Sequence, residues 1–177
     1  MDNPDLWQRC KKGDRDAFKL LYQLHIDDLV AYGRKICSDQ EILEDGIHDL
    51  FVYIWEKREN LSDTDSVIRY LCVSLRRRLV KYMEEDQKIS RNIDMENHVV
   101  TQTSSAESVL IYKEEEDALK HKLSEAISRL PKRQQEAVHL KYYQCLSYEE
   151  ICTVMDINYQ SVRNLIARAM VELRAYM

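Results

Sequence analysis

Apolar side chains recur every three or four positions along most of this sequence, which is the spacing that places them on one face of a helix. The 177 residues include only 3 glycines and 2 prolines, so the turn residues that many short strands need are scarce. Hydrophobic residues make up 45% of the chain, which is enough for a packed core. We therefore predict an all-α fold, and the length allows one ordinary domain or two small ones.

Three helices are predicted in the N-terminal half of the chain. Asp14 can cap the first, a Ser38–Glu41 capping box starts the second, and the third spans about residues 67–82. The polar stretch 57–66 predicts a loop between the second and third helices. The side chains expected to face the core are Phe18, Leu21, His25, Leu29, Tyr32, Ile36, Leu43, Ile47, Leu50, Phe51, Ile54, Leu71, Leu75, Leu79 and Tyr82.

A change in composition separates the two halves of the chain. Threonine, serine, asparagine and acidic residues dominate the sequence from Glu84 to about Ser108, and such a stretch buries too little apolar surface to order itself. We therefore predict two small helical domains joined by a flexible linker. The expected boundaries are 1–83 for the first domain, 84–113 for the linker and 114–177 for the second domain.

The second domain carries the pattern of a helix-turn-helix. A proline break precedes a helix over residues 132–143, and a Ser147–Glu150 capping box then opens a short helix. Residues 156–158 supply a turn, and a longer helix spans residues 159–174. Asp156 occupies a position that usually has glycine in such turns, and aspartate is among the residues that best tolerate a positive φ.

The start of the last helix predicts DNA contacts, because this part of a reading helix enters the major groove. Glutamine and asparagine pair with adenine and arginine pairs with guanine, whereas other basic groups suit phosphates. We assign base contacts to Gln160, Ser161, Arg163 and Asn164, and phosphate contacts to Lys132, Arg133 and Arg168. An ordinary helical hairpin with a solvated polar face is the alternative.

Charge is unevenly distributed in this chain, whose net charge is -5. Residues 67–83 contain five basic residues and no acid, and residues 118–177 contain nine basic and six acidic residues. Basic groups beside aromatic rings suit a melted DNA strand, whose phosphates they neutralise and whose bases stack. We assign this role to Arg69, Tyr70, Arg76, Arg77 and Lys81, while Tyr82 fits either this face or the core.

The second domain resembles region four of bacterial sigma factors. That region has a Leu-Pro-x-Arg motif at the start of one helix and a Ser-x-x-Glu-Ile motif before the reading helix. Leu130–Arg133 and Ser147–Ile151 match these two motifs. The resemblance implies that this domain binds the duplex minus-thirty-five element of a promoter.

The first domain resembles sigma region two, in which a Gln-Asp-x-Phe pattern and a downstream Trp mark the helix that docks on RNA polymerase. Asp49, Phe51 and Trp55 match this pattern, and His48 stands where the Gln is usual. An acidic outer helix face suits a basic protein surface, although it could simply be solvated. The polymerase-binding residues that the resemblance implies are Glu44, Asp45, His48, Asp49, Phe51 and Trp55.

Together the resemblances cover about residues 13–83 and 119–174, a layout similar to the extracytoplasmic-function group, which lacks region three. A member of that group binds core RNA polymerase and directs promoter-specific transcription initiation, with the third helix on the melted minus-ten element. The loop at about residues 60–66 then captures a flipped base, and Arg77 occupies a place where many relatives have Asn. An anti-sigma factor is a common partner of such proteins.

Other classes of function have weaker support. The sequence has no Gly-rich phosphate loop, H-E-x-x-H motif or nucleophile elbow, so we expect neither an enzyme nor a cofactor. Glu44 and His48 could ligate a metal, but such pairs are common by chance and we expect none. The five cysteines lack a C-x-x-C pair and are expected to be reduced. The remaining alternatives are an autonomous helix-turn-helix regulator and a structural scaffold.

Hydropathy favours a cytoplasmic protein without membrane contact. No apolar run approaches the roughly 18 residues that cross a bilayer. The first residues, 1–12, mix acids and bases and do not build a signal-peptide core.

Overall fold

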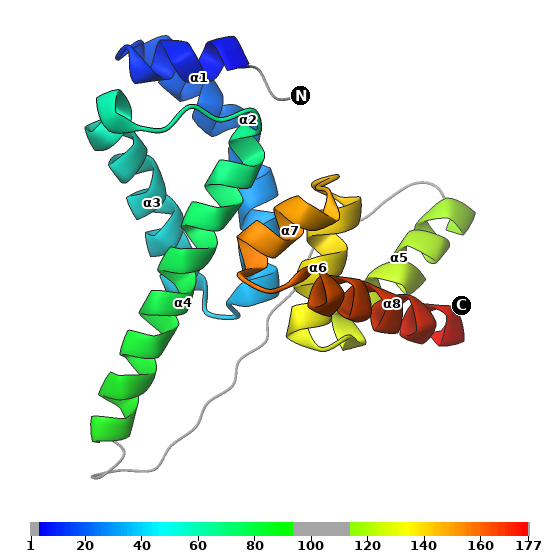
Figure 1. Cartoon of the computed structure of the whole chain (residues 1–177). Helices are drawn as coiled ribbons and strands as arrows, with labels where there is room; N and C mark the ends of the chain where they lie inside the picture. The colour runs from blue at the N-terminus through cyan, green and yellow to red at the C-terminus, as the bar shows by residue number, and fades with distance from the viewer. Residues whose placement is uncertain (1–3, 94–113, 177) are drawn as a thin grey trace.

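The computed structural model describes residues 4–93 and 114–176, and the regular secondary structure in these two ranges is helical, as predicted (Figure 1). In chain order the elements are α1 (Pro4–Lys11), α2 (Arg15–Ile36), α3 (Gln40–Lys57), the 3-10 turn η1 (Arg58–Asn60), α4 (Val67–Ile93), α5 (Glu114–Arg129), α6 (Lys132–Tyr142), α7 (Tyr148–Met155) and α8 (Tyr159–Tyr176).

Helices α2, α3 and α4 form the N-terminal core. The predicted leucines Leu21, Leu50 and Leu75 are fully buried there. Two glycines let the helices approach closely: a Cβ on Gly33 would clash with a leucine of α3, and one on Gly46 would lie 2.7 Å from a leucine Cδ2 of α4. The predicted apolar stripes of these three helices are therefore confirmed as the core of this half, except at Phe18, Ile36 and Tyr82, which are only partly buried.

The starts of α2 and α3 differ in how well the sequence predicted them. Asp14 caps α2 as expected, with its carboxylate accepting from the amides of residues 16 and 17. The prediction that Ser38 caps α3 was wrong. Helix α3 begins at Gln40, and the preceding residue, Asp39, supplies the capping carboxylate. Asp39 Oδ1 accepts from the amides of Glu41 at 2.9 Å and of residue 42 at 3.1 Å.

Helix α1 was not predicted from the sequence. It buries Leu6, Trp7 and Cys10, and the Trp7 indole donates a hydrogen bond to the carbonyl of Ser62 at 3.2 Å. Lys11 also pairs with Asp63 in the same loop. The short helix therefore fastens the α3–α4 loop to the core.

Helix α4 is longer than the sequence indicated. We expected it to end near Tyr82, but the helix continues to Ile93 and takes up the first ten residues of the expected linker. Polar helix-forming residues such as Glu84 and Glu85 continue the helix where its apolar stripe stops. The remaining part of the expected linker, 94–113, lies outside the described residues.

The C-terminal helices follow the predicted pattern closely. Pro131 precedes α6, and the capping box has both of its hydrogen bonds, from Glu150 N to Ser147 Oγ and from Ser147 N to the Glu150 carboxylate. Asp156 ends α7 in the left-handed region, with φ 54° and ψ 51°. The turn residue was therefore predicted correctly in both position and conformation.

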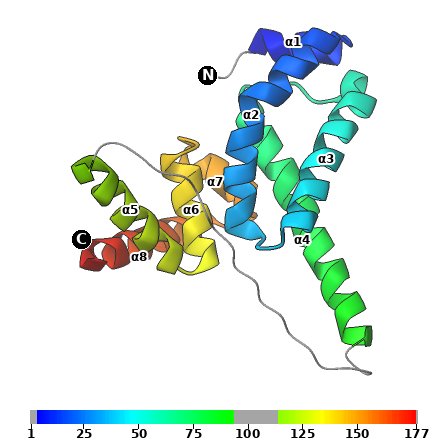
Figure 2. The ribbon, with the colours of Figure 1, turned by 180° about the vertical axis from the view of Figure 1, so that it is seen from behind.

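The two halves pack against each other. Helix α6 lies against α2, and α7 lies against α4, as both views show (Figures 1 and 2). One hydrophobic cluster includes Leu29 of the first half together with Leu140 and Met155 of the second. A smaller cluster, with Ala126 and Ala169, joins α5, α6 and α8. The two halves that the sequence predicted as separate domains therefore share a buried apolar surface.

Candidate nucleic-acid interface

The start of α8 presents the predicted reading residues to solvent. Gln160, Arg163 and Asn164 are exposed and Ser161 is partly exposed, while Val162 beneath them is completely buried. The Gln160 amide nitrogen donates to the Asn164 Oδ1 at 3.0 Å, so these two side chains lie on one face. The structure therefore brings the four base-contact candidates together at the end of the helix suited to the major groove.

The helix pair is locked by caps and packing on both sides of its turn. Ser161 donates its amide to Asn158 Oδ1 at 2.8 Å, which caps α8, and the rings of Tyr148 and Tyr159 lie 5.5 Å apart. The phosphate candidates Lys132, Arg133 and Arg168 are exposed. A rigid helix with exposed polar and basic groups at its start has the geometry of a DNA-reading helix-turn-helix.

The basic face of α4 is partly free. Arg77 and Lys81 are exposed, although Lys81 has an ion pair with Glu85 one helical turn away at 3.7 Å. Tyr70 is half-buried and its ring lies 5.1 Å from that of Trp7. Two of the five minus-ten candidates therefore point to solvent, and the aromatic one is packed against α1.

The other two candidates on α4 are paired with acids of the second half. Arg76 Nε lies 2.7 Å from an oxygen of Glu136, and the same carboxylate accepts a hydrogen bond from the Tyr32 hydroxyl at 3.0 Å. The Glu136 side chain is only 5% exposed. Arg69 lies 3.3 Å from Glu150 and also pairs with an acid of its own half. These contacts cover part of the surface that the sequence assigned to DNA.

A pocket lies beside the loop that was expected to capture a flipped base. It has a volume of about 410 Å³ and is lined by Thr64 of the loop, Tyr70 and Arg77 of α4, Tyr53 of α3 and Thr153 of α7, among others. The loop itself is not uniformly exposed, because Leu61 and Ser66 on either side are buried. We expected a polar, mobile stretch, and the structure instead shows a loop held by buried residues.

Tyr82 belongs neither to the core nor to a free stacking surface. It is half-buried, and its hydroxyl donates to Asp49 Oδ2 at 2.5 Å. This bond lowers the pKa of Asp49 below its ordinary value. The sequence left the place of Tyr82 open and did not predict that it would hold a candidate polymerase contact.

The outer face of α3 is acidic and lies beside an apolar groove. Glu44, Asp45, His48 and Asp49 are exposed, and His48 Nδ1 lies 3.5 Å from Asp49 Oδ1. Within the described residues no group of three or more possible ligands could hold a metal ion. Because they are exposed and lie next to each other or one turn apart on α3, the four charged or polar candidates form one continuous solvent-facing surface.

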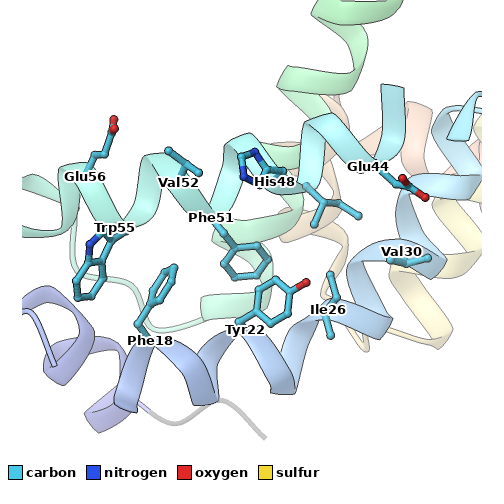
Figure 3. A pocket seen from close by; sticks show the side chains of 11 residues that line it. Phe18, Tyr22, Ile26, Val30, Glu44, His48, Phe51, Val52, Trp55 and Glu56 are labelled. Carbon is cyan, nitrogen blue, oxygen red and sulfur yellow. The ribbon is translucent and has the colours of Figure 1, made fainter. Parts of the chain in front are cut away.

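The groove runs between α2 and α3 and has a volume of about 520 Å³. Figure 3 shows Phe51 and Trp55 pointing from α3 toward Phe18 and Tyr22 of α2. Phe51 is only 4% exposed and its ring lies 4.8 Å from that of Tyr22, while the rings of Trp55 and Phe18 are 5.0 Å apart. The two aromatic polymerase candidates therefore form the floor and wall of the groove, and Phe51 is largely inaccessible.

Sequence reasoning missed the contacts that join the two halves. The alternation of polar residues in α6 (KRQQEAVHLKY) gave little sign that Glu136 and His139 are buried, with 4% of each residue exposed. The sequence analysis also missed the groove between α2 and α3. Phe18 and Tyr22 lie four residues apart on α2, and this spacing indicates an aromatic face there. No helix in the described part of the chain is both long and apolar enough to cross a membrane.

Comparisons with known proteins agree with this geometry. The family model for sigma-70, region 4 matches residues 120–173, which contain the helix-turn-helix. An ECF RNA polymerase sigma factor, SigK of Mycobacterium ulcerans (strain Agy99), is 21% identical over 178 residues, covering 96% of this chain and 90% of that protein.

Two solved structures share the fold. The sigma factor RpoE in complex with the anti-sigma factor NepR from Bartonella quintana has a TM-score of 0.67 and 18% identity, covering 90% of this chain and 95% of that one. CnrH in complex with the cytosolic domain of CnrY has a TM-score of 0.61 and 16% identity, covering 97% and 94%.

Residues 120–173, which hold the locked helix-turn-helix, match region 4 of the sigma factors, a class of transcription regulator. Over nearly its whole length the chain is also similar to an extracytoplasmic-function sigma factor, so the comparisons support the sigma-factor interpretation of the sequence.

Proposed function

We propose that three surfaces of this sigma factor divide the work of initiation. The first residues of α8, Gln160 to Asn164, read the duplex minus-thirty-five element. The exposed row at the start of a capped and buried helix is the observation that carries this assignment. Lys132, Arg133 and Arg168 fix the register of the helix by contacting phosphates, which carry no sequence information.

The α3 face and the α2–α3 groove dock on core polymerase. The exposed acids Glu44, Asp45 and Asp49 supply charge that complements a basic protein surface, and the groove offers an apolar recess beside them. His48 lies between the two features. Trp55, which is partly exposed, gives the groove an aromatic wall that a partner side chain can cover.

The basic face of α4 and the loop before it hold the opened minus-ten strand. Arg77 and Lys81 neutralise its phosphates, and the 410 Å³ pocket beside Tyr70 receives an unstacked base. Arg69 and Arg76 join this surface only when their ion pairs with Glu150 and Glu136 are released. Promoter opening by this protein therefore requires the halves, which we propose as domains 1–83 and 114–177, to separate.

An anti-sigma factor is a further partner that we propose for this chain. RpoE and CnrH, which share the fold, were each solved with a bound partner, named as an anti-sigma factor for RpoE. The apolar groove on α3 is a surface that such a protein could cover in competition with polymerase. Because core polymerase is the target, we place the protein in the cytoplasm.

The experiment that tests the docking surface is co-elution with bacterial core RNA polymerase. We expect the native protein to co-elute and the double variant His48→Ala with Asp49→Ala to bind at least about tenfold more weakly. Phe51 is left intact, because truncating so deeply buried a ring would open the core. Glu149→Ala, an exposed acid on α7, is the matched control.

Binding that the double variant does not change would remove α3 as the docking surface. If the native protein does not bind polymerase at all, with no inhibitor present, direct binding to duplex DNA becomes the function to screen. That result would favour the autonomous regulator.

A further inference from the structure

Charge is balanced in one part of the junction between the halves and unbalanced in another. Around Glu136, the acid of α6 meets Arg76 and the hydroxyl of Tyr32. Around the start of α6, the charge of Lys132 acts on Lys35 of α2, so like charges of the two halves repel each other. The two segments are about a hundred residues apart in the sequence, and only the docked arrangement brings these charges together.

A cavity of about 250 Å³ opens at the unbalanced part. Helix α2 contributes Arg34 and Lys35, α5 contributes Ser124, and α6 contributes Gln135, with Tyr143 at its end. No carboxylate lines this cavity. Its walls therefore offer cationic groups without an acid to neutralise them.

The cations that line this cavity, Arg34 and Lys35, and the neighbouring Lys132 are uncompensated. Among the described residues, no ion pair is formed by Arg34, Lys35 or Lys132. Burial, and then the neighbouring charges of Lys132 and Arg34, lower the pKa of Lys35 below its ordinary value. Like charges held together at a half-buried site oppose docking of α6 on α2, and a bound anion would reverse that effect.

An aromatic platform borders the same cavity. The rings of His139 and Tyr143 are stacked, with centroids 5.1 Å apart and an angle of 8° between their planes. Tyr143 is 63% exposed, so its outer face is available to a ligand. Cations beside an exposed flat ring are the combination that binds a phosphate attached to a base or another ring.

We propose that this cavity is a binding site for a phosphate-bearing small molecule, which bridges the two halves and stabilises their docked arrangement. Arg34 and Lys35 of α2, which line the cavity, bind the phosphate groups, and Lys132 of α6 adds positive charge beside Lys35. Tyr143 stacks on the organic part of the ligand. Because the ligand holds the halves together, it opposes the release of Arg69 and Arg76.

Calorimetric titration of the full chain with inorganic pyrophosphate, at an ionic strength held constant with sodium chloride, tests the site. We expect one saturable site per chain, about tenfold weaker binding in Lys35→Gln, which removes a charged contact, and a smaller loss in Lys132→Gln, which removes a neighbouring charge. Lys19→Gln, which removes an exposed charge elsewhere on α2, should leave the affinity unchanged. The absence of saturable binding, or an equal loss in Lys19→Gln, would overturn the proposal.

A second titration distinguishes the sources of phosphate. Binding of ADP that Tyr143→Ala weakens, while pyrophosphate binding is unchanged, identifies a free nucleotide-like ligand. If a short duplex DNA shows the Lys35-dependent binding and pyrophosphate shows none, the cations contact nucleic acid and the small-molecule site is wrong. Neither titration depends on transcription, so failure here leaves the sigma function untouched.

Discussion

The two surfaces that we propose to bind DNA differ in how far the protein itself covers them. The reading row on α8 is exposed apart from the partly exposed Ser161, and the side chains of Gln160 and Asn164 are hydrogen-bonded to each other. The basic face of α4 has two of its arginines, Arg69 and Arg76, paired with glutamates of α6 and α7. The docked form therefore exposes the proposed duplex-reading surface, whereas acids of the same chain occupy part of the proposed single-strand surface.

The largest expected effect comes from removing the buried acid at the junction. Glu136→Ala leaves Arg76 and the Tyr32 hydroxyl without their partner, which should weaken docking of the halves by about 3 kcal/mol. Small-angle X-ray scattering should show a larger radius of gyration with unchanged helical content. Glu125→Ala, which breaks an exposed ion pair on α5, is the control and should leave the radius unchanged. An unchanged radius in Glu136→Ala would mean that the pair does not hold the halves.

Acidic pH is expected to weaken docking of the two halves by a somewhat smaller amount. The pKa of His139 is lowered to about 4, chiefly by burial and then by the charge of Lys35. An unfolded or undocked His139 titrates near 6.5, so between about pH 6.5 and 4 the open form binds a proton that the docked form does not. Docking is therefore fully stable above pH 6.5 and weakens as the pH falls, by about 2 kcal/mol at pH 5.

Denaturant unfolding at pH 7 and pH 5 measures this loss. His139→Phe, which keeps a ring between Tyr32 and Tyr143, should remove that part of the pH dependence and leave only the part due to carboxylates. If His139→Phe loses as much stability between pH 7 and pH 5 as the native protein, His139 is not the titrating group.

A substitution in the exposed reading row on α8 should affect promoter selection and not docking of the halves. Arg163→Ala removes a base contact and should weaken selective binding to the minus-thirty-five element by about 2 kcal/mol, with docking and polymerase binding intact. Transcription from matched and mismatched promoters measures this change. Arg174→Ala, in the last turn of the same helix, controls for simple loss of charge. Normal promoter selection by Arg163→Ala would remove the assignment of the reading row.

The smallest expected effect is on local strain next to α7. Cys145 and Asp156 both have a φ of 54°, where non-glycine residues are disfavoured. Cys145→Gly should raise the free energy of unfolding by about 1 kcal/mol, and Asp156→Gly by less, because aspartate tolerates this conformation better. Thermal denaturation compares the two variants. A larger gain in Asp156→Gly would show that its carboxylate is not adapted to the turn.

The helices and the reading row could be predicted because they depend on local patterns. Apolar spacing located α2, α3 and α4, and the Ser147–Glu150 box and Asp156 located the turn before α8. Helix α1 was missed because its few apolar residues sit among charges, although Leu6 and Cys10 are four apart and Pro4 suits a first helical position.

The junction between the halves could not be predicted from local patterns. The pairing of Arg76 with Glu136 joins residues sixty positions apart, and in sequence both look like solvated charges. The same holds for Tyr32, which the periodicity placed in a core but whose hydroxyl partner lies in the other half. Long-range polar contacts depend on how preformed helices dock, and one sequence alone does not state this.

The number of residues between the end of α4 and the start of α5 limits the promoters that we propose this protein to engage. The helix has 27 residues and ends at Ile93, and α5 begins at Glu114. Even fully extended, the chain between these two residues can reach only about 70 Å, which is the length of about 20 base pairs of duplex. Apart from the size of the domains themselves, this covalent reach is the greatest distance that can separate the two DNA-facing halves. The length of this connecting segment therefore sets an upper limit on the spacing of the promoter elements that one molecule can engage at once. This limit does not depend on either reading surface.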